Sequence, residues 1–235
     1  MSKYSASLLL LPSRMIMFLV FQGLIALLIG SFPESQHYWL LSASATNLVS
    51  ILILITLLKQ EGIRFLGLFR FKRETWKSDL VRFLLLTLVC GPVVFLPNHF
   101  LSIWIFGDVS IPFNMMFQPM KLPLLIMITV IFPVTIAFAE LATYFAYIMP
   151  RLKLQLKHGW MSVALPVVFL AIQHCTLPFI PDGSFIAYRA LVYLPFACVI
   201  GTALYFRPSL FPYFALLHGI LDFGTVMVLF SLQGS

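Results

Sequence analysis

The chain has 235 residues, of which 61% are hydrophobic and only 10% are charged. A soluble domain carries roughly 25% charged residues, so this composition excludes a water-soluble globular protein. Apolar stretches of about 20 residues, the length that crosses a bilayer as a helix, recur along the whole chain. We therefore expect an all-α, polytopic membrane protein whose residues 1–235 form a single integral-membrane domain.

The formal net charge of +7 comes from basic residues that lie where short loops meet apolar segments. This distribution favours membrane topology over binding to nucleic acid, and membrane lipids are the expected surroundings. The cysteines lie in apolar runs without metal or redox spacing, so we expect no disulfide framework. These cysteines are Cys90, Cys175 and Cys198.

The apolar pattern predicts about seven transmembrane helices. They cover residues 15–30, 38–58, 80–96, 121–149, 160–179, 187–206 and 210–232. Pro97 is expected to end the third helix. Pro133 is expected to kink the fourth, because an interior proline removes a backbone donor and clashes with the preceding turn.

Two segments do not fit a spanning helix. Residues 59–79 mix basic and aromatic side chains, which is typical of a segment that lies along the membrane surface and faces anionic lipid. Residues 100–120 are rich in aromatic residues and methionine but are interrupted by Asp108 and Pro112. We interpret this second segment as an outer-face lid or a re-entrant piece.

Cytoplasmic loops of membrane proteins carry an excess of Lys and Arg. With the N-terminus in the cytoplasm, only Lys121 and Arg189 of the 15 basic residues lie outside, and Arg14 is counted as a cytoplasmic flanking charge. The expected arrangement is a multi-pass protein of a bacterial inner (plasma) membrane, with its C-terminus outside.

Glu140 is a carboxylate in the middle of an apolar run. An ionisable residue inside a membrane is costly, so it predicts a functional site whose partners must be sought. Asp222, His174 and His218 also fall within predicted spans. Counted at about 1.5 Å per residue from the predicted cytoplasmic edge, the four lie about 16–25 Å deep, near the middle of the membrane. We expect them to face one another in a cavity, with His218 and Asp222 on one helical face because they are four residues apart.

The chain around these residues resembles the CAAX-protease and bacteriocin-processing (CPBP, ABI-like) family of intramembrane glutamic endopeptidases. The family pattern is Glu-Glu-x-x-x-Arg, often followed by a Gly-aromatic-x-x-Pro-Arg-Leu tail, then Phe-x-x-x-His, then His-x-x-x-Asn/Asp. Residues 146–152 match the tail, which aligns Glu140 with the first Glu and places Leu141 and Phe145 where the family has Glu and Arg. In the second motif Leu170 takes the place of the family's Phe, four residues before His174. The third motif, His218-x-x-x-Asp222, is intact.

The resemblance implies a metal-independent peptide hydrolase without cofactors, with residues 122–231 as its catalytic core. Residues 1–121 would then hold the N-terminal spans, the basic interfacial segment and the outer-face loop. Glu140 and His174 would activate a water, while His218 and Asp222 would support the oxyanion of the attacked peptide. The expected substrate is a peptide or a membrane protein.

Other interpretations use the same four side chains. They could only join helices by hydrogen bonds, as polar residues in membranes often do. They are also suitable zinc ligands, although the chain has no His-Glu-x-x-His helix. A proton-coupled carrier, or a non-catalytic protein with an immunity or binding role, would need them as well.

Overall fold

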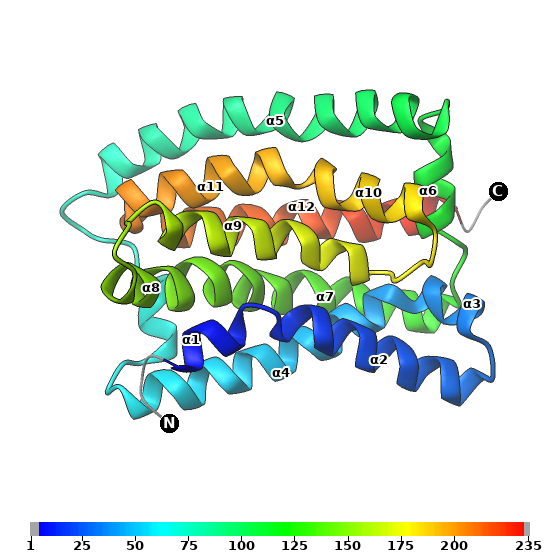
Figure 1. Ribbon diagram of the computed structural model, residues 1–235, viewed down its shortest axis with the longest axis horizontal. Coiled ribbons are helices and arrows are strands. Elements are labelled where there is room, and N and C mark those ends of the chain that lie inside the picture. The colour runs from blue at the N-terminus through cyan, green and yellow to red at the C-terminus, as the bar shows by residue number, and fades with distance from the viewer. Residues whose placement is uncertain (1–4, 233–235) are drawn as a thin grey trace.

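The computed structural model describes residues 5–232, and the regular structure in this part of the chain is helical throughout (Figure 1). The α-helices are α1 (Ser5–Leu10), α2 (Ser13–Ile29), α3 (Phe32–Ser35), α4 (Trp39–Gln60), α5 (Trp76–Phe106), α6 (Ser110–Met116), α7 (Leu122–Leu141), α8 (Met149–Gln155), α9 (Met161–Gln173), α10 (Gly183–Val192), α11 (Leu194–Phe206) and α12 (Phe211–Ser231). Short 3₁₀ turns are η1 (Gln36–Tyr38), η2 (Phe65–Phe69), η4 (His174–Thr176) and η5 (Pro208–Leu210). A π-helical turn, η3 (Ala142–Ile148), joins α7 to α8.

In the described residues, five helical segments are long and apolar enough to cross a membrane. They are Phe32–Gln60, Trp76–Phe106, Leu122–Gln155, Gly183–Phe206 and Pro208–Ser231. The apolar helices Ser13–Ile29 and Met161–Thr176, which coincide with the first and fifth predicted spans, are shorter. The protein is therefore an all-helical, membrane-embedded, multi-pass protein.

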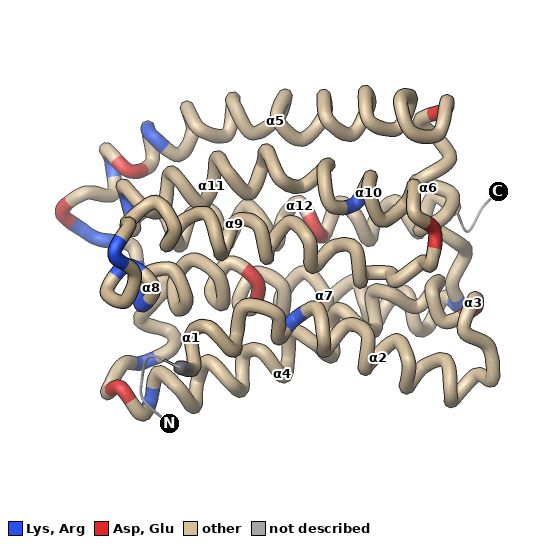
Figure 2. Tube along the Cα trace, viewed as in Figure 1, with Lys and Arg blue, Asp and Glu red and all other residues tan. Residues whose placement is uncertain are grey.

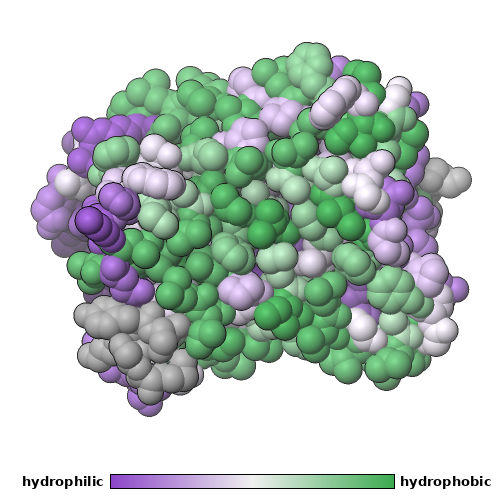
Figure 3. Space-filling view, viewed as in Figure 1, coloured by the Kyte–Doolittle hydropathy of each residue, from purple (hydrophilic) through white to green (hydrophobic). Residues whose placement is uncertain are grey.

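The surface has the polarity that a lipid environment requires. Basic residues gather at one end of the bundle, around α8 and the start of α5 (Figure 2). On the face shown in Figure 3, apolar side chains cover most of the length between the polar ends. Helix α5 carries many of the exposed apolar residues, among them Val81, Leu85 and Leu88. We expect these exposed apolar side chains to contact lipid.

The predicted end of the third span at Pro97 is wrong. Helix α5 continues through Pro92 and Pro97 to Phe106, where Gly107 closes it in a left-handed conformation with φ of 79°. A proline removes one backbone hydrogen bond, and membrane helices tolerate that loss when the neighbouring turns remain helical. Residues 100–106, assigned to the lid, are thus the last turns of a long helix.

The remainder of the predicted lid packs against the protein. Met116 at the end of α6 and Met120 are buried in an apolar cluster. The Nε1 atom of Trp39 donates a hydrogen bond to the carbonyl oxygen of Met116 over 3.1 Å. This segment therefore covers one end of the bundle.

The basic segment 59–79 is attached to the bundle through aromatic rings. The ring of Phe69, in η2, lies 4.7 Å from that of Phe138 and 5.2 Å from that of Phe211. Phe71 and Trp76 remain about half exposed. Phe71 nevertheless packs its ring 4.7 Å from that of Tyr213, so aromatic residues expected at a lipid surface also hold the segment to α7 and α12.

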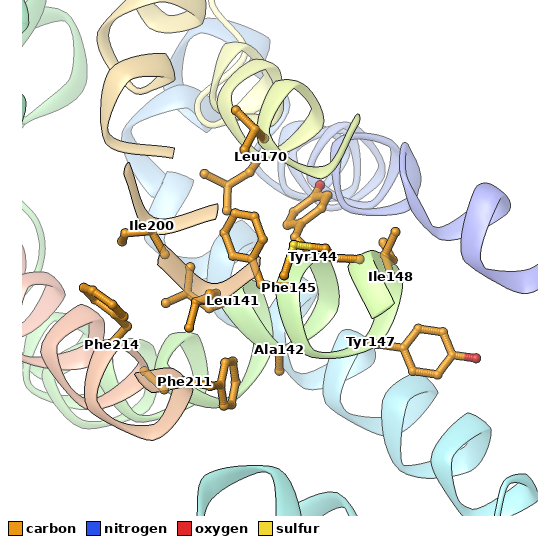
Figure 4. Packing of buried hydrophobic residues seen from close by; sticks show 14 of the residues in the cluster. Leu141, Ala142, Tyr144, Phe145, Tyr147, Ile148, Leu170, Ile200, Phe211 and Phe214 are labelled. Atoms are coloured by element: carbon orange, nitrogen blue, oxygen red, sulfur yellow. The ribbon is translucent and has the colours of Figure 1, made fainter. Parts of the chain in front are cut away.

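Two apolar clusters fill the interior, one toward each end of the bundle. On α4, the first cluster includes Leu54 and the second includes Ala43. On α12, the first cluster includes Ala215 and the second includes Val226. Figure 4 shows part of the first cluster, around η3. The gap between the clusters is filled by polar side chains, and we call it the polar layer: Arg14, Asn47, Ser50, Glu140, Gln173, His174, His218 and Asp222.

Helix α7 lies at the centre of the bundle and packs most extensively against α12 and α4. Gly219 permits the close approach of α12, because a Cβ at this position would lie 2.9 Å from the Cβ of Ala137 and 3.0 Å from the carbonyl oxygen of Pro133. The neighbouring His218 is thereby brought to the centre of the bundle.

We expect Gly219→Ala to lower the free energy of unfolding by about 1–3 kcal/mol, because overpacking forces the two helices apart. Thermal unfolding in detergent micelles measures the effect. Gly224→Ala on the same helix is the matched control, since a Cβ there meets no atom of the described chain within 4 Å. Equal stability of the two variants would contradict the close packing of α7 and α12.

Candidate active site

Glu140 lies in the last turn of α7, directly before the π-helical turn η3, and is only 3% exposed. Its two carboxylate oxygens face different helices. The Oε2 atom accepts a hydrogen bond from the Nε2 atom of Gln173 over 2.7 Å and lies 3.7 Å from a terminal nitrogen of Arg14. The Oε1 atom lies 3.0 Å from the Nε2 atom of His218. The carboxylate therefore joins α2, α9 and α12 to α7.

Arg14 is fully buried in the first turn of α2. Its Nε donates to the Oε1 of Gln173 over 2.9 Å, and its two terminal nitrogens donate to the Oγ of Ser50 over 3.1 Å and the Oδ1 of Asn47 over 2.9 Å. Each nitrogen of the guanidinium thus has a polar partner. Together with Glu140, Arg14 forms a buried ion pair of zero net charge.

The expectation that Arg14 is a cytoplasmic flanking charge is wrong. Helical structure already begins with α1 at Ser5, and α1 packs beside η3 and α8 at the basic end of the bundle. The break at Leu11 and Pro12 then turns the chain into α2. Arg14 follows that break inside the bundle, so it belongs to the polar layer and not to the flank of a span.

Gln173 connects the members of the ion pair and is fully buried. Besides donating to Glu140 and accepting from Arg14, it accepts a hydrogen bond from the Tyr144 hydroxyl over 3.3 Å. The sequence pattern did not predict Gln173, Asn47 and Arg14 as site residues. A signal was available, because an amide in an apolar run needs a hydrogen-bonding partner just as a charge does.

His218 and Asp222 both project from α12. The Nε2 atom of His218 lies 3.5 Å from the Oδ2 atom of Asp222, so this imidazole stands between two carboxylates. Within the described chain, neither of these two buried atoms has a partner in hydrogen-bonding geometry. The two side chains are 15% and 20% exposed, compared with 4% for the side chain of Glu140. They form the more accessible side of the site.

His174 lies where α9 passes into the 3₁₀ turn η4. Its Nδ1 atom is 2.8 Å from the carbonyl oxygen of Leu170. A carbonyl oxygen only accepts, so Nδ1 carries the proton in this hydrogen bond, and Nε2 of the neutral ring presents a lone pair. His174 directly follows Gln173, whose amide donates a hydrogen bond to Glu140. The structure thus brings all four predicted site residues into the polar layer.

Arg189 binds the backbone at His174 and the Tyr193 side chain that stacks on the His174 ring. Its guanidinium donates to the backbone oxygens of His174 and Leu177 over 3.1 and 2.6 Å, and to the Tyr193 hydroxyl over 2.8 Å. The Tyr193 ring stacks on the imidazole with the centroids 3.8 Å apart. Arg189 was expected outside the membrane, but it is buried on α10, and its role is internal hydrogen bonding.

Irregular backbone gathers around the polar layer. The α1–α2 break precedes Arg14, η3 follows Glu140, η4 begins at His174, and the α10–α11 break falls at Tyr193. A π-helical turn inside a helix is frequent at functional sites. Interrupted helices are tolerated at membrane depth when the freed backbone groups are buried in protein.

Leu141 and Phe145, the two positions that differ from the family motif, lie in the apolar cluster at the basic end of the bundle (Figure 4). Phe145 packs beside Gly201, where an added Cβ would lie 3.0 Å from its ring. The counter-charge for Glu140 therefore comes from Arg14 on another helix and not from position 145.

In the described residues, no group of three or more His, Cys, Asp and Glu side chains is arranged to hold a metal ion. The fold and the polar layer define a multi-pass α-helical membrane protein with a buried carboxylate–imidazole cluster. Comparison with family models, curated proteins and solved structures finds no match.

Replacing Gln173 by Met should lower the free energy of unfolding by about 3 kcal/mol, because Glu140 and Arg14 would each lose a hydrogen bond inside the bundle. Gln155→Met is the control, since the Gln155 amide makes a part-buried hydrogen bond to Ser7 at the end of the bundle. That variant should lose about 1 kcal/mol or less. Chemical denaturation in micelles measures both, and equal losses would contradict the bridging role of Gln173.

Proposed function

We propose that the protein is an intramembrane endopeptidase that hydrolyses a peptide bond with a water activated by Glu140 and His174. The observation that supports this most directly is the juxtaposition of the Glu140 carboxylate and the His218 imidazole, 3.0 Å apart. Four side chains that could act in hydrolysis come from three helices and meet between two apolar clusters. The motif resemblance to CPBP proteases favours the same activity.

In the proposed mechanism the two carboxylate oxygens of Glu140 have different roles. Oε2 is engaged by Gln173 and Arg14, so Oε1 is the oxygen that removes the proton from the attacking water. The lone pair on Nε2 of His174 shares this proton. The water oxygen then bonds to the peptide carbonyl carbon, and the captured proton finally passes to the amine that leaves.

His218 is assigned to the oxyanion. An imidazole donor aimed at the developing negative charge stabilises the transition state more than the ground state. Asp222, whose Oδ2 atom lies 3.5 Å from Nε2 of His218, is assigned to orient this ring. The partial exposure of both side chains leaves this side of the site open to the peptide.

The membrane arrangement belongs to the same proposal. Helices α1 and α2 together form the first of seven spans, and α9 with η4 forms the fifth. The basic end of the bundle in Figure 2 faces the cytoplasm of a bacterial cell, because Lys and Arg are retained on that side. Helix α12 then ends on the outer side.

A second candidate is a proton-coupled carrier or a binding protein without turnover. It is favoured by the helix breaks at Pro12 and Tyr193, since interrupted helices near the middle of the membrane form binding sites in many transporters. Mass spectrometry of co-expressed membrane peptides separates the two functions. New peptide termini support the peptidase, whereas proton uptake into proteoliposomes without cleavage supports the carrier.

Glu140→Gln should reduce cleavage of a membrane-peptide panel by about 10²–10⁴-fold, the usual contribution of a general base. Glu74→Gln, at an exposed position outside the polar layer, should retain activity and serves as the control. Both variants are compared at equal amounts of folded protein. Persistent turnover in Glu140→Gln would exclude the proposed base.

Cleavage should be unaffected by a metal chelator, because Glu140 and His174 activate the water directly. The measurement compares turnover before and after EDTA treatment, together with the metal content of the purified protein. Activity that is lost in EDTA and restored by zinc would favour a metallopeptidase instead.

A further inference from the structure

The ion pair between Arg14 and Glu140 lies deep inside the bundle. The Arg14 side chain is fully buried and that of Glu140 is 4% exposed. An isolated charge in such surroundings is strongly unfavourable, and a pair is tolerated when hydrogen bonds satisfy its remaining donors and acceptors. Gln173, Asn47 and Ser50 make those hydrogen bonds to Arg14.

The location of Arg14 on its own helix points to a role toward Glu140. The N-terminus of a helix carries a partial positive charge, so a cation in the first turn of α2 is unfavourable in isolation. Its nearest compensating charge in the described chain is the carboxylate of Glu140, 3.7 Å away. Local helix energetics alone would therefore select against arginine here.

We propose that Arg14 is the positioning residue that keeps Glu140 ionised and directs its Oε1 atom toward His218. Arg14 and Gln173 together engage Oε2, and this leaves Oε1 as the oxygen for chemistry. The first helical unit, α1 and α2, is then a necessary part of the site. The chemical use of Oε1 rests on the proposed hydrolysis, but the charge state of Glu140 can be tested without it.

The experiment compares infrared spectra of the full-length protein in micelles at neutral pH, using the C=O stretch of a protonated carboxyl as the signal. Wild type and Glu140→Gln should show the same intensity in this band. Arg14→Met should gain a band that disappears in the double variant Arg14→Met/Glu140→Gln. This subtraction assigns the signal to Glu140 and separates it from Asp222.

Thermal unfolding of the same variants tests whether the two residues are coupled. Arg14→Met should lower the unfolding temperature by about 10 °C, as expected when one partner of a buried pair is removed. The double variant, which removes both charges, should recover part of the loss. Arg207→Met is the control, because Arg207 pairs with Asp79 at the basic end of the bundle.

Arg14→Lys preserves the positive charge and keeps the proposal testable if Arg14→Met fails to fold. It should show no protonated Glu140 band and, where cleavage is detected, should retain more turnover than Arg14→Met at a similar KM. A Glu140 that stays ionised in Arg14→Met, or additive effects in the double variant, would overturn the proposal. So would wild-type kcat in Arg14→Met.

The outcome is separable from that of the proposed function. If the protein cuts no peptide, the infrared band and the thermal coupling still decide whether Arg14 keeps Glu140 ionised. If it cuts peptides and Arg14→Met behaves like Arg207→Met, the hydrolase assignment stands and the positioning role fails.

Discussion

A carboxylate in the middle of a membrane bundle is stable only when the protein replaces the water that it has lost. In this structure Arg14, Gln173 and His218 surround the carboxylate of Glu140 at 2.7–3.7 Å. Breaking such a pair typically costs about 3–5 kcal/mol, which is comparable to much of the stability of a domain. The arrangement of the helices around Glu140 is therefore constrained by this one group.

The helices that meet this constraint are distant in sequence. Arg14 and Gln173 are 159 residues apart, and Gln173 and Glu140 are 33 apart. Packing in lipid adds little hydrophobic driving force between helices, so polar contacts and close backbone approach gain importance. Gly219 supplies the close approach between α12 and α7, and the polar layer supplies the directional contacts.

The apolar clusters on either side give the polar layer its low-polarity surroundings. The same surroundings that make an unpaired charge expensive also strengthen each hydrogen bond within the layer. The helix breaks and the π-helical turn occur beside Arg14, Glu140, His174 and Tyr193. The irregular backbone thus lies next to the side chains of the polar layer. Stability and any chemistry of the site are thus coupled through the same contacts.

Much of the fold and part of the site follow from the sequence. The composition and the apolar runs sufficed to predict an all-helical membrane protein, because the length of a bilayer-crossing helix is set by the bilayer itself. The cost of intramembrane charge likewise identified Glu140 and Asp222, and with them His174 and His218.

Other features depended on tertiary structure. The third predicted span ended too early at Pro97, because neighbouring turns carry a helix past a proline, and the lid expected at residues 100–120 is partly helix α5. Arg14 and Arg189 looked like charges near the membrane edges, and only the folded chain shows that both are buried. Hydropathy reports where each residue lies along its own segment, whereas the partner that makes a buried arginine tolerable belongs to another helix. The sequence alone therefore determined which groups need partners, and the packing of the helices decided which partners they have.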